Sequence, residues 1–300
     1  MWETKKLPLA VIVFTVSFYK VTSGSTELMD MAPDAVDDLY NGCSEKAMKK
    51  FIESGMLTQE LDQNEGVKKA WNENNKCSKL IPGGIKEHTT ALSAMANGDP
   101  DSKKAFNNAV KTMGTNESTY ENFNFKSLHF LLIDSMKLVQ NQNAKQCKTV
   151  YYLSEGICTT QLKSKVRLGG FTIAFKSYGV LKEFEDWNGR TIFNITTCFF
   201  FNLDENVCSQ DEDMVLLSPV EVFTVKSEKK VVDRINEDSY TQIVLEQPEL
   251  GNSHNCYIFS RSPADVSALW LVLVLVVYLL FGSLKLMKEP FKIPCCSETY

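Results

Sequence analysis

An acidic triplet, Asp211-Glu212-Asp213, stands directly before the apolar run Met214–Leu217. A carboxylate can stabilise positive charge that develops in a transition state, and it can hold a guanidinium group through two hydrogen bonds. Side chains two residues apart on a strand point the same way, so Glu212 and Met214 would share a face. Taken alone, such a triplet is more typical of an acidic turn before a strand. The sequence around it has to decide between the two interpretations.

That surrounding sequence contains four short motifs. They are C-K-T-V-Y-Y at Cys147–Tyr152, R-L-G-G-F at Arg167–Phe171, I-F-N-I-T-T-C at Ile192–Cys198 and D-E-D-M-V-L-L-S-P at Asp211–Pro219. In this combination the chain resembles the vertebrate ecto-mono-ADP-ribosyltransferases, which move ADP-ribose from NAD to a protein arginine. The resemblance extends from about Asp30 to Arg261 and includes the acidic opening segment Asp30–Cys43. It implies a split β-sheet of the type found in ADP-ribosylating toxins, with NAD in the cleft between the sheets.

The resemblance also assigns roles to single positions. Tyr152 stands where an arginine should bind the pyrophosphate of NAD, and Ile173 stands where a serine should position the nicotinamide ribose. Glu212 keeps the first glutamate of a Glu-x-Glu motif, whereas Met214 replaces the second, catalytic one. Losing one preorganised electrostatic group commonly lowers a rate by about 10²–10³. We therefore expect weak or lost transferase activity.

Two further positions belong to the same implied site. Arg167 and Gly169, in the second motif, stand at cofactor-binding positions of the family pattern. The partners that the resemblance implies are NAD, as substrate, and an extracellular protein that presents an arginine. No metal is implied.

The residues after the acidic triplet fix its register, since Val215–Pro219 and Glu221–Phe223 match the family run that follows the catalytic glutamate. A shift of one residue would put Asp213 at the catalytic position, but its side chain would then point to the opposite face. Using Asp211 and Asp213 together would require a β-bulge. Three hypotheses follow: a catalytically weak member kept as a recognition or NAD-binding module, an active arginine-specific transferase, and a hydrolase that only cleaves NAD.

The elements that must position these residues change character near Thr149. Before it, apolar residues recur at helical spacing and predict helices at Ser44–Met56, Glu65–Asn74, His88–Ala96, Ser102–Met113 and Phe125–Val139. After it, short β-branched or aromatic runs predict strands at Val150–Leu153, Gly170–Phe175, Thr191–Thr197, Met214–Leu217 and Glu221–Lys226, and further strands at Val231–Arg234, Thr241–Glu246 and Cys256–Arg261. Helices first and strands afterwards predict an α+β domain. A Rossmann fold is not supported, because no Gly-x-Gly-x-x-Gly follows a strand.

Both ends of the chain carry targeting features. Two lysines, the apolar run Leu7–Tyr19 and small residues after it predict a signal peptide at residues 1–23. A second apolar run followed by lysines predicts a transmembrane helix at 264–284 and a short cytoplasmic tail at 285–300, with a cleaved GPI signal as the alternative. Residues 24–263 would then form one ADP-ribosyltransferase-like ectodomain on the outer face of the cell membrane.

The nine cysteines suit an oxidising compartment. The resemblance implies two bridges, Cys43–Cys256 and Cys147–Cys198. Cys158 with Cys208 is a candidate third pair, which would leave Cys77 free or intermolecular.

Other residue patterns predict modifications and limit the classes of partner. Sequons at Asn116 and Asn194 predict N-glycosylation, the first in a polar turn and the second in a predicted strand. The net charge of −5 and the scattered lysines argue against a nucleic-acid partner. The three histidines lack further ligands at metal spacing, which argues against a zinc site.

Overall fold

The structure is a computed structural model that describes residues 26–142, 146–181, 183, 187–203, 207–208, 213–232, 239–259 and 272–277. The predicted signal peptide, Glu212, the predicted tail and most of the predicted span 264–284 lie outside the described residues. Residues 272–277 are helical. Within the described ranges, no helix combines the length and the apolar character needed to cross a membrane.

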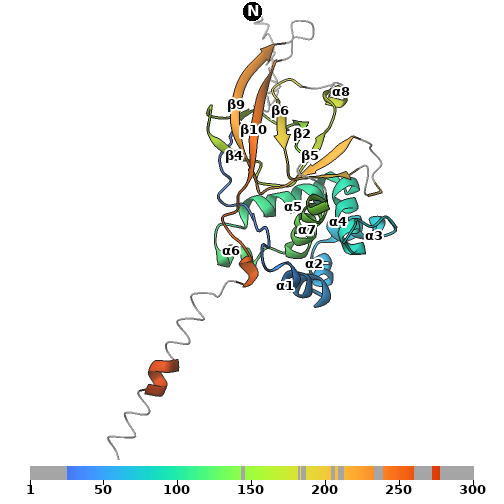
Figure 1. Cartoon of the computed structure of the whole chain (residues 1–300), viewed down its shortest axis with the longest axis vertical. Helices are drawn as coiled ribbons and strands as arrows, with labels where there is room; N and C mark the ends of the chain where they lie inside the picture. Colours follow the sequence, from blue (N-terminus) through green and yellow to red (C-terminus); the bar gives the residue numbers. More distant parts are fainter. Residues whose placement is uncertain are drawn as a thin grey trace, which may run out of the picture.

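The first half of the chain is helical, as its spacing predicts (Figure 1). The helices are α1 (Ser44–Met48), the π-helix η1 (Lys49–Glu53), α2 (Met56–Gln63), α3 (Glu65–Asn74), α4 (Lys86–Asn97), α5 (Pro100–Thr112), α6 (Glu117–Glu121) and α7 (Lys126–Gln142). The predicted helix Ser44–Met56 ends early, because Gly55 takes a left-handed conformation (φ 84°) and starts a new helix. Helix α5 begins at Pro100 because the Asp99 side chain accepts a hydrogen bond from the backbone N–H of Ser102.

The second half supplies the strands. They are β2 (Lys148–Leu153), β4 (Lys165–Arg167), β5 (Thr172–Phe175), β6 (Thr191–Thr197), β7 (Phe200–Asn202), β8 (Met214–Leu217), β9 (Glu221–Val232) and β10 (Ser239–Leu250), with the short helix α8 (Tyr178–Leu181) after β5. Among the described residues these strands form one sheet in the order β4-β9-β10-β6-β2-β5-β8-β7. A separate pair joins β1 (Glu27–Leu28) to β3 (Cys158–Thr159) in parallel.

One strand prediction is confirmed in its described part, and another was wrong. Val231 and Val232, the described part of the predicted strand Val231–Arg234, form the end of β9, which pairs with β10 as far as Val232. The predicted strand Cys256–Arg261 is a 3₁₀ turn over Tyr257–Phe259 in its described part. The buried Asp38 carboxylate accepts hydrogen bonds of 2.8 Å from the backbone N–H groups of Cys256 and Tyr257, and this holds the chain in a tight bend.

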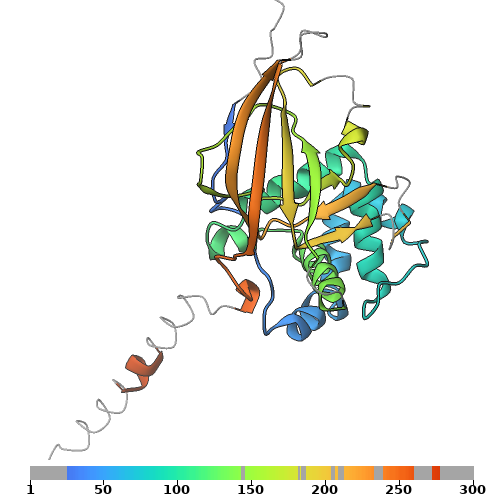
Figure 2. The same cartoon turned by 45° about the horizontal axis from the view of Figure 1, so that its top comes forward.

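The sheet is split between β2 and β5. Six register pairs join β2 to β6 and four join β5 to β8, but within the described residues Tyr151 and Phe175 alone connect β2 with β5. One half therefore consists of β4, β9, β10, β6 and β2, and Figure 2 shows the long β9–β10 hairpin beside β6. The other half consists of β5, β8 and β7. This arrangement confirms the predicted α+β class with a helical first half.

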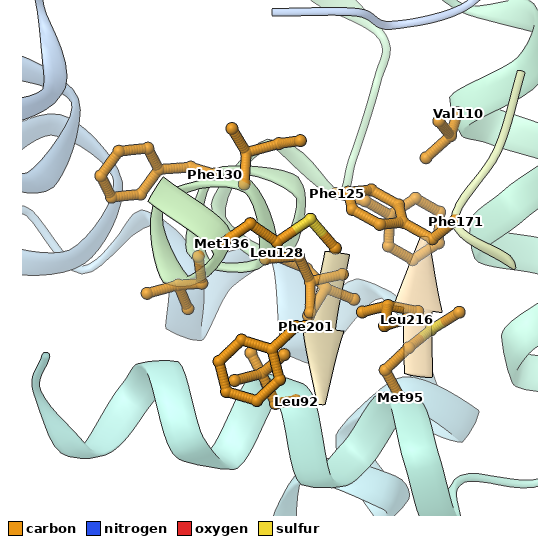
Figure 3. Packing of buried hydrophobic residues seen from close by; sticks show 14 of the residues in the cluster. Leu92, Met95, Val110, Phe125, Leu128, Phe130, Met136, Phe171, Phe201 and Leu216 are labelled. Atoms are coloured by element: carbon orange, nitrogen blue, oxygen red, sulfur yellow. The ribbon is translucent and has the colours of Figure 1, made fainter. Parts of the chain in front are cut away.

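Two apolar clusters fill the interior. The helix-side core lies between the helices and β5, β7 and β8, and its members include Leu92, Met95, Phe130, Met136, Phe171, Phe201 and Leu216 (Figure 3). The sheet core lies between the two sheet halves and includes Val150, Ala174, Phe193, Val215, Leu217, Phe223 and Ile243. Strand β8 contributes alternate residues to each cluster, which explains why Met214–Leu217 is apolar without interruption.

Three disulfides connect distant parts of this fold. Cys43–Cys256 and Cys147–Cys198 are the pairs that the resemblance implied. The third bridge joins Cys77 to Cys208, so the expected Cys158–Cys208 pair was wrong. Hydrogen bonds from Lys79 to the carbonyl of Val207 and from Asn97 to the carbonyl of Cys208 hold this segment against the helical half, beside Cys77. Cys158 lies on β3, buried in the sheet core with a free thiol.

Candidate functional site

A cleft of about 840 Å³ opens between helix α5, the N-terminal segment and strand β2. Its walls come from residues 27–34, from the side of α5 that carries Asn107 and Lys111, from residues 152–158, and from residues 167–169. Three of the predicted site residues line it, namely Tyr152, Arg167 and Gly169. Ile173 and Met214 are not among its lining residues, and Glu212 lies outside the described residues.

Tyr152 is near the end of β2, and its ring stacks on that of Phe193 with centroids 5.7 Å apart and planes 19° apart. Both residues line the cleft. Burial raises the pKa of Tyr152 to about 12, so the phenol is neutral at physiological pH. A neutral phenol can donate one hydrogen bond, whereas a guanidinium presents a charged fork of donors to a pyrophosphate. Tyr152 thus offers an aromatic surface where the family pattern has a cation.

Ile173 and Met214 lie on neighbouring strands and face the helix-side core. Ile173 pairs in register with Leu216, and Met214 pairs with Phe175. Met214 is only 6% exposed. Neither side chain carries a polar or charged group, and both contribute packing to that core.

Asp213, the alternative carboxylate, is occupied elsewhere. Its side chain accepts a hydrogen bond of 2.8 Å from the backbone N–H of Ser177, and its carbonyl accepts one from Lys176. The carboxylate therefore closes the turn after β5 and is not among the residues that line the cleft. This geometry does not supply the carboxylate that Met214 lacks.

Arg167 is buried, and its guanidinium is already engaged. It donates to Asp37 at 2.6 Å, to the carbonyl of Met31 at 2.8 Å and to Ser253 at 3.2 Å. Asp37 also accepts hydrogen bonds from the backbone N–H groups of Ser253 and His254, and its carboxylate lies 3.4 Å from the His254 ring nitrogen Nδ1. Although Arg167 borders the cleft, its donors are used to tie the N-terminal segment to the end of the domain.

Gly169 and the glycine after it allow helix α5 to approach closely. Gly169 has a left-handed φ of 70°, and a Cβ there would lie 3.0 Å from the Cβ of Ala32. Asn107 of α5 bonds both to the N–H and to the carbonyl of Phe171, each at 2.9 Å. The R-L-G-G-F motif is thus a docking site for α5, and it shapes one wall of the cleft.

The two predicted glycosylation sites and the buried His129 lie outside the cleft. Asn116 is exposed and caps α6 by accepting a hydrogen bond from Thr119. Asn194 is half-buried in β6, between β10 and β2. His129 is fully buried and bonds to the Tyr40 hydroxyl and to the carbonyl of Val36, both at 2.9 Å. In the part of the chain that the structure describes, no group of three or more His, Cys, Asp or Glu side chains is placed to hold a metal ion.

Sequence reasoning missed the contribution of α5 and of the N-terminal segment to the cleft. A usable signal was present on α5, where Lys104, Asn107 and Lys111 recur at intervals of three and four residues and so share one helical face. The part played by residues 27–34 depends on the pairing of β1 with β3, which leaves no local pattern in the sequence.

Comparisons with known proteins agree with this geometry. The family described as NAD:arginine ADP-ribosyltransferase matches residues 29–249 of the chain. T-cell ecto-ADP-ribosyltransferase 1 of Mus musculus is 31% identical over 252 residues, which cover 81% of this chain and 82% of that protein. GPI-linked NAD(P)(+)--arginine ADP-ribosyltransferase 1 of Mus musculus is 28% identical over 297 residues, which cover 90% and 89%.

A solved structure gives the same result. The eucaryotic mono-ADP-ribosyltransferase ART2.2 superposes with a TM-score of 0.62 at 27% identity, covering 78% of this chain and 100% of that one. Mutants of ART2.2 have been solved in complex with NADH and with NAD. By fold, by motif and by sequence along most of its length, the chain therefore belongs to the NAD:arginine ADP-ribosyltransferase family.

Proposed function

We propose that the protein is a cell-surface member of this family whose transferase activity is weak or lost, and that its fold serves as a recognition or NAD-binding module. The observation that carries the proposal is Met214, an apolar side chain packed into the helix-side core at the position of the catalytic glutamate. Cleavage of the glycosidic bond of NAD builds positive charge on the ribose, and a thioether cannot stabilise that charge as a carboxylate does.

Retention of NAD binding is supported by the cleft. A volume of about 840 Å³ is within the range of small-molecule and cofactor sites, and the half-buried ring of Tyr152, stacked on the buried ring of Phe193, adds an aromatic group to its lining. The missing arginine removes one contact to the pyrophosphate and leaves the rest of the cleft in place. The expected result is NAD binding without rapid turnover.

The surface location is supported by relatives that are named ecto-enzymes, one of them GPI-linked. For this chain we propose a cleaved signal at residues 1–23 and a membrane anchor in 264–284. The lysines that follow this segment favour a retained helix with residues 285–300 in the cytosol, by the positive-inside rule. Treating cells with a phospholipase specific for GPI should leave the protein in place, whereas its release would indicate a GPI anchor.

One experiment separates the three activities that the family pattern allows. Purified full-length protein is incubated with NAD labelled in its ADP-ribose part and with an arginine-rich acceptor protein, alongside an active family member as positive control. No product supports the proposal, label on the acceptor would show an active transferase, and free ADP-ribose would show a hydrolase. A triple variant, Tyr152→Arg with Ile173→Ser and Met214→Glu, should recover partial activity if it folds. Each single reversion should restore little transferase activity, because these residues act as a unit.

A further inference from the structure

Helix α5 brings a lysine to the wall of the cleft. Lys111 is exposed and lines the cleft together with Tyr152 and Cys158. Its side chain crosses the glycine pair of the R-L-G-G-F motif, since a Cβ on Gly170 would lie 3.4 Å from Lys111 Cε and one on Gly169 would lie 3.7 Å from Lys111 Cγ. The aliphatic stem therefore rests on the backbone, and the ammonium group projects beyond it.

The position of this stem is fixed by the helix that carries it. Asn107 lies one turn before Lys111 and bonds to both backbone groups of Phe171. Residues four apart on a helix share a face, so the contact that docks Asn107 also directs Lys111 towards residues 169–170. The lysine is thus placed by a two-point hydrogen bond and by close packing on glycine.

Lys111 shares the cleft lining with Cys158, which is on β3, next to the segment that follows Tyr152. Burial raises the pKa of the Cys158 thiol, the charge of Glu27 acts in the same direction, and the charge of Lys111 acts in the opposite one.

Lys104 lines the cleft from the same face of α5, almost two turns before Lys111, and two other cations of the lining are engaged in bonds. Arg167 is neutralised by Asp37, with 2.6 Å between the charged atoms, and Lys103 bonds to the carbonyl of Ala96. Among the described residues, no ion pair involves Lys111. The acidic residues that line the cleft are Glu27, Asp30 and Asp34 in the N-terminal segment and Glu155 after β2. The lysines of the lining thus all lie on α5, whereas the acidic residues lie on the other two segments.

We propose that Lys111 is a phosphate-binding residue that supplies, for a nucleotide in this cleft, the positive charge that Tyr152 does not carry. The inference rests on the proposed function of the cleft and names its ligand class, a nucleotide with a diphosphate group. A lysine binds phosphate as a point charge and not as a two-pronged fork, so the position of the cation can differ from that of an arginine on β2. Lys111 also lies in the last turn of α5, where its charge stabilises the helix terminus, and the test must separate these two roles.

Measuring the binding of four probes to the purified full-length protein separates phosphate binding by Lys111 from its effect on the helix terminus. ADP, ADP-ribose and NAD carry phosphate, and adenosine does not. In isothermal titration, Lys111→Met should weaken the binding of ADP and ADP-ribose by about tenfold, the order of one charge-assisted hydrogen bond, and leave adenosine unchanged. Lys111→Arg should retain binding, and Lys49→Met, an exposed lysine outside the cleft, should have no effect. Adding Tyr152→Arg to Lys111→Met should restore affinity for ADP.

The outcomes are distinct. Unchanged ADP affinity in Lys111→Met, an equal loss for adenosine, or no binding of any phosphate probe by the wild type would each overturn the inference. Binding of ADP but not of NAD by the wild type would reject the NAD-binding module and still support Lys111 as the phosphate-binding residue.

Discussion

Met214 lies directly across from Phe175 in the β5–β8 pair, and both side chains pack against the helix-side core. A carboxylate at position 214 would meet an aromatic ring there and would lose contact with water. Any change at position 214 therefore also changes packing, because Met214 is part of the helix-side core. This coupling has a measurable consequence for reversion of the site.

The first prediction is that Met214→Glu lowers the free energy of unfolding by roughly 2–3 kcal/mol at neutral pH, because it buries a carboxylate without a partner. The matched control Met214→Leu keeps volume and polarity and should cost less than about 1.5 kcal/mol. Urea denaturation measures both. The cost of the glutamate should shrink at low pH, where the group is protonated. Equal stability of the two variants at neutral pH would show that position 214 is open to solvent.

The second prediction concerns the unexpected bridge. Replacing both Cys77 and Cys208 by serine should lower stability by roughly 2–5 kcal/mol, the usual effect of removing a native disulfide. A non-reducing digest should yield one linked peptide that contains both residues. Cys158 should resist alkylation in the native protein and react after unfolding, since it is buried and free. A linked peptide that joins Cys158 to Cys208 would contradict this pairing.

The third prediction tests the ion pair between Arg167 and Asp37, whose side chains are 4% and 1% exposed. Asp37→Asn should lower the free energy of unfolding by roughly 3–5 kcal/mol, because it leaves a buried guanidinium without its counter-charge. Glu249→Gln, which breaks the exposed pair with Lys165, is the control and should cost under about 1 kcal/mol. Thermal or chemical denaturation distinguishes them. Similar losses in both variants would show that burial of Arg167 is unimportant.

The fourth prediction is a pH dependence due to His129. Burial lowers the pKa of His129 from 6.5 to about 4, while its bond to the Val36 carbonyl acts in the opposite direction. Between these pH values the unfolded chain binds the proton and the folded chain does not, so stability rises with pH. His129 therefore contributes roughly 3 kcal/mol to the pH dependence of the free energy of unfolding. This stability is fully present above about pH 6.5 and is lost as the pH falls towards 4.

A variant isolates this contribution from that of the other titrating groups. His129→Gln cannot titrate, so its stability should vary less than that of the wild type between pH 6.5 and 4, whatever its absolute value. Denaturant midpoints at several pH values give both curves. Parallel curves over this window would exclude His129 as the source.

Much of the architecture could be predicted from local patterns. Helix α3 and strands β6 and β8 have the predicted bounds, because each is a regular run closed by polar or turn-forming residues. Strands β1, β3, β4 and β7 have two or three residues each and carry too little periodicity to be found. Their positions depend on partners distant in sequence, as when β4 pairs with β9.

The site was predicted less completely than the fold, for a similar reason. The motifs located Tyr152, Ile173 and Met214, but only the fold shows that the last two face the helix-side core. Arg167 was expected at the cofactor, yet its partner Asp37 is distant in sequence, and no local rule connects them. The pairing of Cys77 with Cys208 likewise depends on how β7 and the segment after it pack on the helices.

The carboxylates of Asp37 and Asp38 and the Cys43–Cys256 disulfide all hold residues 253–257, the bend that follows β10. Tension applied to the chain beyond Phe259 would reach the covalent bond at Cys256 before it reached β10. That bond passes the load to Cys43, at the start of α1, so the hydrogen bonds between β10 and its neighbours are spared. If residues 264–284 anchor the chain as proposed, the Cys43–Cys256 disulfide would carry the pull of that anchor and the strands of the sheet would stay paired.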